Sequence, residues 1–363
     1  MENGRKHSLS FGHSPGGILP MIIITFLPLA IASGLCSIVS CSSGGSVSPD
    51  APAAAGTVPH PGGRDIPLTD TPVTVFVREP GINGDGAAVP TRAGDWHLIR
   101  RLDLFVFNDD ALRTLDAYTR SYAYTPEAVT VSSASGEKIL VAVANHAFPD
   151  DFVTTIHNYE DLRRSVVSFT GDHPSWPVMS GETCFTAGPG QGCSVTLEPM
   201  MSSIEIKSVK SPAGGPALRN VKVYLTGVGN RTELLRTEGF LPAETLNNGR
   251  LSETDLGRLA YSGMVYKYLG NGKADGNGSS YGSAVLYCYP NEAEEESFAS
   301  PYTRLVIEGM LDGKTCYYPI PINRGSFISS GAEGIGRNRR YVFDLTLTRP
   351  GTESPDEDVL PGP

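Results

Sequence analysis

The sequence has little positive charge: 29 Lys and Arg residues stand against 39 Asp and Glu residues, and the net charge is -10 at pH 7. A surface of this sign repels phosphate backbones, and no basic stripe with interleaved aromatic residues offsets the repulsion. The chain therefore lacks the features of a nucleic-acid-binding protein.

Metal-binding patterns are also missing. The 7 histidines form no H-E-x-x-H motif and no other close pair, and the 6 cysteines include no C-x-x-C spacing. The acidic run at residues 292–296 is typical of a solvated loop rather than of a ligand set. We expect no metal, no cofactor and no small-molecule substrate.

Catalytic motifs are weak. Residues 278–282 (GSSYG) match the G-x-S-x-G pattern of serine hydrolases, but the buried strand and the helix that must flank it are not indicated. Residues 309–315 (GMLDGKT) resemble a phosphate loop but are one residue short of its spacing, and a hairpin turn explains them better. We therefore expect a protein that is not an enzyme.

Stretches with helical periodicity are scarce, and period-two alternation of apolar residues dominates the chain. Residues 72–78 and 98–107 alternate, and residues 137–145 are almost all apolar, as in a strand buried on both faces. Residues 158–169 give the best helical pattern, with Asn158 as a possible cap. With 41 Gly and 28 Pro residues, the pattern predicts an all-β fold of two β-sandwich domains, at 71–200 and 201–350.

The N-terminal region carries the most specific signal. Arg5 and Lys6 precede a charge-free apolar run at residues 18–35, and residues 38–41 (IVSC) place a small residue directly before Cys41. This order predicts a lipoprotein signal peptide at 1–40 and an acylated Cys41 as the mature N-terminus. A retained transmembrane anchor, or a signal cut elsewhere with Cys41 free, is the alternative.

The segments beside the domains have distinct compositions. Residues 41–70 are small, rich in proline and free of aromatic residues, so they read as a flexible tether. Residues 351–363 form an acidic, proline-rich tail. The tether would space the folded part from the membrane.

Four cysteines remain after the signal peptide and Cys41 are set aside: Cys184, Cys193, Cys288 and Cys316. An even number in an exported chain favours disulfides. The first two flank a Gly/Pro turn, and the other two lie in strand-like, tyrosine-rich runs. Three pairings are possible, and we expect the local one, Cys184 with Cys193 and Cys288 with Cys316.

Several stretches in order resemble the fimbrillin-associated anchor family, the FimB-type anchor and accessory subunits of outer-membrane fimbriae within the fimbrillin superfamily. They are LIRRLDLFVFNDD, KILVAVANH, PVMSGE, VTLEPMMSSIEIKSV, YPN, TRLVIEGM, CYYPIPI and RNRRYVFDLTLTRPGTESPDEDV. The resemblance covers residues 73–359. It implies a structural protein of two transthyretin-like β-sandwiches at the cell surface.

In that superfamily, shaft subunits lose their first strand to an arginine- or lysine-directed protease, and a strand of the next subunit fills the groove. Anchors keep their lipid, here palmitate-type chains on Cys41, stay uncut and tie the fibre to the outer membrane. The resemblance makes residues 72–78 the first strand of this chain. Four arginines lie near its end: Arg78, Arg92, Arg100 and Arg101.

The tail after Arg349 departs from a donor strand, because it has four prolines and little alternation. It fits a terminal position in the fibre better than a shaft position. The resemblance thus implies shaft subunits as partners, bound by β-strand augmentation or edge contact. A tip adhesin, a shaft subunit, or a surface carbohydrate-binding lipoprotein is the alternative. Trp96 and Trp176 are the only tryptophans for stacking on sugars, although 15 tyrosines could substitute.

Overall fold

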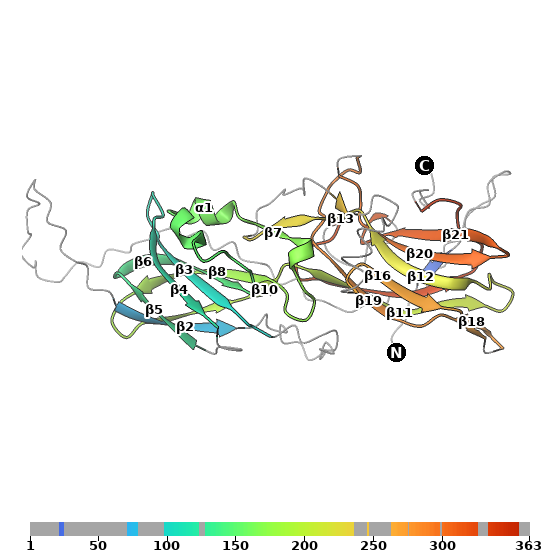
Figure 1. The fold of residues 1–363 in the computed structure, drawn as a ribbon, viewed down its shortest axis with the longest axis horizontal. Helices are drawn as coiled ribbons and strands as arrows, with labels where there is room; N and C mark the ends of the chain where they lie inside the picture. The colour runs from blue at the N-terminus through green and yellow to red at the C-terminus, as the bar shows by residue number, and fades with distance from the viewer. Residues whose placement is uncertain are drawn as a thin grey trace, which may run out of the picture.

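The computed structural model describes residues 22–24, 71–78, 98–122, 128–235, 245–246, 263–274, 276–297, 300–325 and 333–355. Strands dominate these residues, which confirms the all-β fold class (Figure 1). Cys41 and the tether lie outside the described residues, as does nearly all of the apolar N-terminal run. In the described part of the chain no helix is long and apolar enough to cross a bilayer.

The N-terminal sandwich has two sheets. One sheet has the order β10-β8-β6-β3-β4 and the other the order β5-β2-β9. The bounds are β2 (Thr71–Arg78), β3 (Leu102–Asn108), β4 (Leu115–Ser121), β5 (Ala128–Ser133), β6 (Gly136–Ala144), β8 (Met179–Ala187), β9 (Gly192–Thr196) and β10 (Glu198–Pro199).

The C-terminal sandwich also has two main sheets. One runs β1-β22-β11-β18-β17, with β19 also on β11, and the other runs β16-β12-β20-β21. The bounds are β1 (Ile22–Ile24), β11 (Ser202–Pro212), β12 (Arg219–Thr226), β16 (Tyr266–Gly270), β17 (Lys273–Ala274), β18 (Gly278–Ser280), β19 (Ala284–Cys288), β20 (Arg304–Leu311), β21 (Lys314–Pro321) and β22 (Arg340–Leu347). The chain passes from the first sandwich to the second between β10 and β11.

Smaller elements lie around the joint of the sandwiches. Strand β7 (Val166–Ser168) pairs with β14 (Arg231–Glu233), and β13 (Val228–Gly229) pairs with β15 (Thr245–Leu246). Helix α1 (Tyr159–Arg163) and two 3-10 turns, η1 (Phe152–Thr155) and η2 (Phe169–Gly171), precede or follow β7. Helix α1, the two 3-10 turns and β7 carry the chain over the outer face of the N-terminal sandwich toward the second one, where β7 pairs with β14 (Figure 1).

The two sandwiches have different cores. The core between the N-terminal sheets has no aromatic residue among its buried members, which are Val73, Val75, Ile99, Leu102, Leu104, Val106, Val131, Leu140, Ala142, Ala144, Met179, Ala187, Cys193, Val195 and Leu197. The other cluster fills the C-terminal sandwich, includes Tyr289, Tyr318 and Phe343, and continues under α1 on the outer face of β3 and β6. The alternation of β3 decides this split, since Leu104 faces the first core and Phe105 the second.

Two short segments can be compared with their sequence patterns. The helical pattern at 158–169 gives only the five-residue α1, which begins at a capping box of Asn158 and Asp161. The β-branched Val166 and Val167 then favour a strand, which pairs with β14. The Gly/Ser-rich stretch at 270–282 contains the β17–β18 hairpin, and β18 pairs with β11.

The two catalytic look-alikes can be placed in the fold. Residues 278–282 begin as strand β18, and no helix follows before β19, so the turn that a serine hydrolase needs is not formed. The expected hairpin at 309–315 is confirmed: Asp312 and Gly313 both have positive φ and join β20 to β21.

Candidate assembly site

Strand β2 is the centre of the small N-terminal sheet. It runs antiparallel to β5 over Thr71 to Phe76 and parallel to β9 over Thr74 to Arg78. Both of its edges are therefore paired. Removing β2 would leave facing edges on β5 and β9 and an open groove between them.

The side chains of β2 follow the expected alternation. Val73 and Val75 are fully buried in the aliphatic core and Val77 packs against it, whereas Phe76 is 49% exposed. Burying each fully enclosed valine contributes roughly 1.5–3 kcal/mol. The strand therefore closes the first core with small, uniform side chains.

A glycine lets β9 approach β2 closely. A Cβ built on Gly192 would lie 2.9 Å from the Thr74 carbonyl oxygen and 3.4 Å from the Phe76 ring. Any larger residue would push the two strands apart. The contact between β2 and β9 thus depends on the missing side chain of Gly192.

The four arginines near the end of β2 differ in their surroundings. Arg78 is the last residue of β2, and Arg92 lies outside the described residues. Asn145 holds the backbone at Arg100 and Arg101. Its side-chain oxygen accepts from the backbone amide of Arg100 at 2.8 Å, and its backbone amide donates to the carbonyl oxygen of Arg101 at 2.9 Å. A protease would have to break these two hydrogen bonds to cleave after Arg100 or Arg101.

Arg101 is also fixed by its side chain. Its Nε lies 2.7 Å from an oxygen of Asp103, whose side chain is completely buried, and Arg120 contacts the other oxygen at 2.8 Å. The Tyr118 hydroxyl donates to the same carboxylate at 2.5 Å. Burial and this carboxylate raise the pKa of Tyr118 to about 12, so the hydroxyl stays a donor.

The two sandwiches are joined by Arg337, which lies between β21 and β22 in the chain. Its guanidinium donates to main-chain carbonyl oxygens at distances of 2.8–3.4 Å, and these belong to Ser180, Glu198, Pro199 and Leu234. It also donates to the Ser180 hydroxyl at 2.8 Å. One side chain of the second sandwich therefore binds β8 and β10 of the first.

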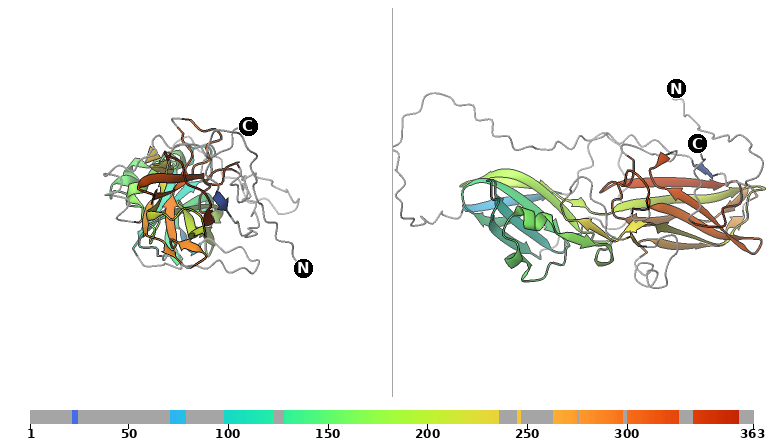
Figure 2. Two further views of the ribbon diagram at one scale, coloured as in Figure 1. Left: turned by 90° about the vertical axis from the view of Figure 1, so that its right-hand side faces the viewer. Right: turned by 90° about the horizontal axis from the view of Figure 1, so that it is seen from above.

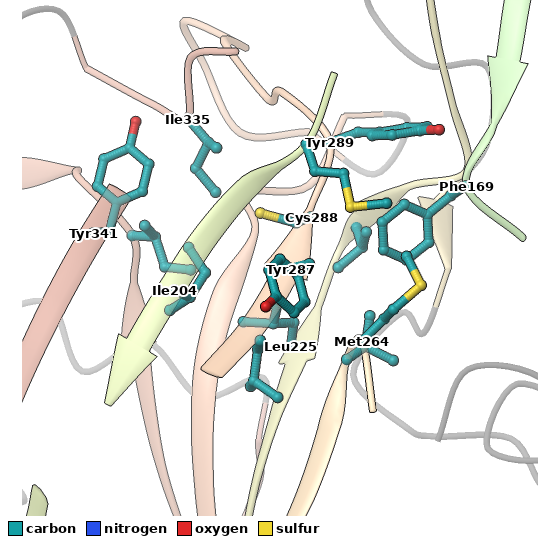
Figure 3. Packing of buried hydrophobic residues seen from close by; sticks show 14 of the residues in the cluster. Phe169, Ile204, Leu225, Met264, Tyr287, Cys288, Tyr289, Ile335 and Tyr341 are labelled. Carbon is teal, nitrogen blue, oxygen red and sulfur yellow. The ribbon is translucent and has the colours of Figure 1, made fainter. Parts of the chain in front are cut away.

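A buried carboxylate adds a second link. Asp172 accepts from the Tyr289 hydroxyl at 2.9 Å and from the amides of Val178 and His173 at 2.8 Å. Burial raises the pKa of Asp172 to about 7, although these hydrogen bonds oppose the shift. Phe169 packs edge-on against Tyr289 with ring centroids 5.0 Å apart, beside Met264 (Figure 3).

The C-terminal segment after β22 turns back onto its own sandwich. Thr352 and Tyr317 exchange both backbone hydrogen bonds, at 2.8 and 3.0 Å, on the outer edge of β21. The Tyr318 hydroxyl donates to the Arg349 carbonyl at 2.9 Å. The beginning of the tail is thus held as a short cover for an edge strand.

Trp176, a candidate sugar platform, has a stacked partner on each side. The His173 ring lies parallel to it at 3.7 Å and the Arg100 guanidinium lies 3.4 Å from its centroid. Two groups at these distances cannot share one face of the indole. Trp96 lies outside the described residues.

The structure shows no disulfide between any two of the four candidate cysteines, so the expected local pairing stays a prediction. Cys193 faces the aliphatic core, whereas Cys184 pairs with Ile139 on the opposite face of its sheet. Cys288 in β19 and Cys316 in β21 belong to different sheets and not to neighbouring strands. Burial raises the pKa of Cys193 to about 11 and also raises that of Cys288, so these thiols stay protonated.

The described residues hold no group of three or more metal-ligating side chains, and the arrangement consists of strand edges and joints rather than reactive groups. Arg337 and Asp172 were not singled out from the sequence. Neither stands in a recognisable motif, because Ser180 lies 157 residues from Arg337 in the chain and Tyr289 lies 117 residues from Asp172.

 The two contacts come together only when the sandwiches dock, so no local signal could have revealed them.

Comparisons with solved structures agree with this two-sandwich architecture. A fimbrilin of Porphyromonas gingivalis matches with a TM-score of 0.55 and 17% identity, over 79% of this chain and 92% of that one. A candidate cell adhesion protein of Bacteroides eggerthii gives 0.59 and 18%, over 82% and 94%. The tip fimbrial protein Mfa3 of P. gingivalis, truncated at its C-terminus, gives 0.50 and 14%, over 75% and 93%.

The fold therefore defines a two-sandwich β protein of the kind seen in these fimbrial and adhesion proteins. At such identities the similarity establishes the fold alone. No protein-family model matches the chain, and no curated protein sequence does so either.

Proposed function

We propose that this chain is a lipid-anchored basal or accessory subunit of a cell-surface fimbrium, a member of the fimbrillin superfamily that acts without catalysis. Lipid on Cys41 would fix it in the outer membrane, and the folded part would hold the end of the fibre. The fold shared with a fimbrilin and with a tip fimbrial protein supports a fimbrial role. The transthyretin-like topology and the domain boundaries at residues 200 and 201 stay predictions.

The observation that carries the anchor role is the state of the two chain segments that a shaft subunit would exchange. Strand β2 closes its own sandwich, and the start of the C-terminal tail is bound to the outer edge of β21. Within the described residues, which end at Pro355, neither segment is offered to a neighbour as an extended strand. That arrangement suits the end of a fibre.

The surroundings of the arginines support an uncut chain. Arg100 and Arg101 are held by Asn145, and Arg101 is paired with the buried Asp103. Cleavage would therefore have to occur at Arg78 or Arg92. An anchor would keep both bonds intact, whereas a shaft subunit would be cut at one of them.

Deletion of the gene tests the proposal. An anchor that ends fibre growth predicts longer fibres that are shed into the medium, seen by electron microscopy of cells and culture supernatant. Complementation with a Cys41→Ala variant should restore the protein but not the attachment. Unchanged fibres on the deletion strain would remove the fimbrial role.

The second candidate is a tip or shaft subunit of the same kind of fibre, which the similarity to the tip protein favours. It predicts subunits at the distal end or along the fibre rather than at its base. Immunogold labelling of intact fibres separates these positions. Gold confined to the cell surface at fibre bases supports the anchor, and gold along the shaft or at the tip supports the alternative.

A further inference from the structure

Two strands of eight residues lie at the outer side of the C-terminal sheets, and they are protected differently. Strand β21 contains Pro319 and Pro321, which cannot donate to a neighbouring strand, and the tail pairs with it at Thr352. Strand β22 contains no proline. Its inner side pairs in parallel with β11 over Arg340 to Thr346.

In the described part of the chain, β1 is the only strand that pairs with the outer side of β22. The three residues Ile22–Ile24 run antiparallel to Leu345–Leu347, so that Ile22 lies opposite Leu347 and Ile24 opposite Leu345. Within the described residues, no strand pairs with the outer side of β22 before Leu345. Figure 2 shows the dark blue β1 lying among the red strands of the C-terminal sandwich.

The segment that covers this edge belongs to the predicted signal peptide. If processing occurs before Cys41, β1 is absent from the mature protein, and all eight residues of β22 present an open edge. Such an edge is a template for strand addition unless something covers it. Its side chains are ordered for pairing, since β22 alternates strictly between buried and half-buried positions.

We propose that the outer edge of β22 accepts a strand from an adjacent fimbrial subunit, antiparallel to β22 and with apolar residues opposite Leu345 and Leu347. The proposal rests on the fimbrial role and names its contact point. Leu345 and Leu347 are fully buried, so the residues paired with them must be apolar to exclude water from that face. Thr346 between them is half-buried, so the residue paired with it can be polar or apolar. The backbone register of β1 places Ile24 and Ile22 opposite these two leucines.

The anchoring of β22 to β11 makes it a rigid template. Arg340 pairs with Glu205, and Asp344 accepts from the Ser208 hydroxyl and lies 3.7 Å from Lys210. These contacts join the inner side of β22 to β11. Strand addition on the outer side would leave them unchanged.

A peptide of residues 20–26 (PMIIITF), with lysines added for solubility, provides a defined probe. The protein is the mature chain of residues 42–363 carrying Cys184→Ser and Thr346→Cys, and the peptide carries Ile23→Cys. The register places Ile23 opposite Thr346, so mild oxidation should give one disulfide-linked product, measured by mass spectrometry. A matched protein carries Thr315→Cys on β21 in place of Thr346→Cys.

A second peptide, N-methylated on alternate amides, keeps the side chains and loses the edge hydrogen bonds. We expect its cross-linking yield to fall by at least about tenfold. Equal yields for the two peptides, equal yields at the two cysteine positions, or no product at all would overturn the proposal. The gene deletion distinguishes this proposal from the fimbrial role. If the peptide adds to β22 but the deletion strain has unchanged fibres, the partner is not a fimbrial subunit. If the deletion alters the fibres but the peptide does not add, the fimbrial role stands and the edge of β22 is not the contact.

Discussion

The cores of the two sandwiches consist of different kinds of side chain. The N-terminal core is aliphatic, and one strand near the start of the folded chain, β2, closes it between β5 and β9. The C-terminal core includes large buried rings such as Tyr289, Tyr318 and Phe343. A core of small, similar side chains can accept a replacement strand, whereas a core that includes large rings is more specific to its own residues.

Removal of β2 should give the largest difference in stability between the two sandwiches. A chain that begins at residue 79 loses two fully buried valines and both ladders of β2, so the N-terminal sandwich should lose its cooperative fold while the C-terminal one remains. Hydrogen exchange should show unprotected amides in β5 and β9 and protected ones in β11. A chain beginning at residue 71 is the control, and protection of β5 and β9 without β2 would contradict the comparison.

Arg337→Ala should have the next largest effect, because it leaves several carbonyl oxygens at the joint without their donor. We expect a loss of about 2–4 kcal/mol in the free energy of unfolding and earlier unfolding of one sandwich. Chemical denaturation followed separately in the two sandwiches measures this. Arg339→Ala, at an exposed position nearby, should cost little, and equal losses in the two variants would refute the joint.

Gly192→Ala should weaken the contact of β2 with β9 alone. The added methyl group meets the Thr74 carbonyl oxygen, and we expect a cost of about 1–3 kcal/mol confined to the N-terminal sandwich. Gly188→Ala is the matched control, since its Cβ would make only an ordinary contact at 3.6 Å with Gln191. Thermal unfolding curves of the two variants should differ. Identical curves would mean that the contact between β2 and β9 does not depend on the missing side chain of Gly192.

Asp172→Asn should change the pH dependence of the joint. Because burial raises the folded-state pKa of Asp172 to about 7, above the unfolded value, the folded protein binds the proton more tightly, and this group's contribution to stability falls as pH rises from about 4 to about 7. The difference in unfolding free energy between variant and parent should therefore shift in favour of the variant over that window. Parallel pH profiles for Asp172→Asn and the parent would contradict the buried carboxylate.

The strands that face a core could be predicted from the sequence, and those that do not could not. Strand β6 is buried at every position from Lys138 onward, and β22 alternates strictly, so their apolar patterns are plain. Strand β4 is half-buried at all of its positions and gives no alternation. Strand β18 is a Gly/Ser segment whose pairing is supplied by β11.

The site residues divide in a similar way. The first strand and its inward valines follow from period-two alternation alone. The joint made by Arg337 and Asp172 depends on how two separate sandwiches dock, which a local pattern does not encode. The cysteines show the same limit, since the face on which Cys184 and Cys193 lie depends on strand register and not on their spacing.

Intact mass spectrometry of the protein isolated from the outer membrane tests the central claim most directly. An uncut anchor predicts a single species that begins at an acylated Cys41 and retains β2. A chain without lipid that begins after Arg78 or Arg92 would contradict the claim, because it would have given up the strand that closes the N-terminal sandwich.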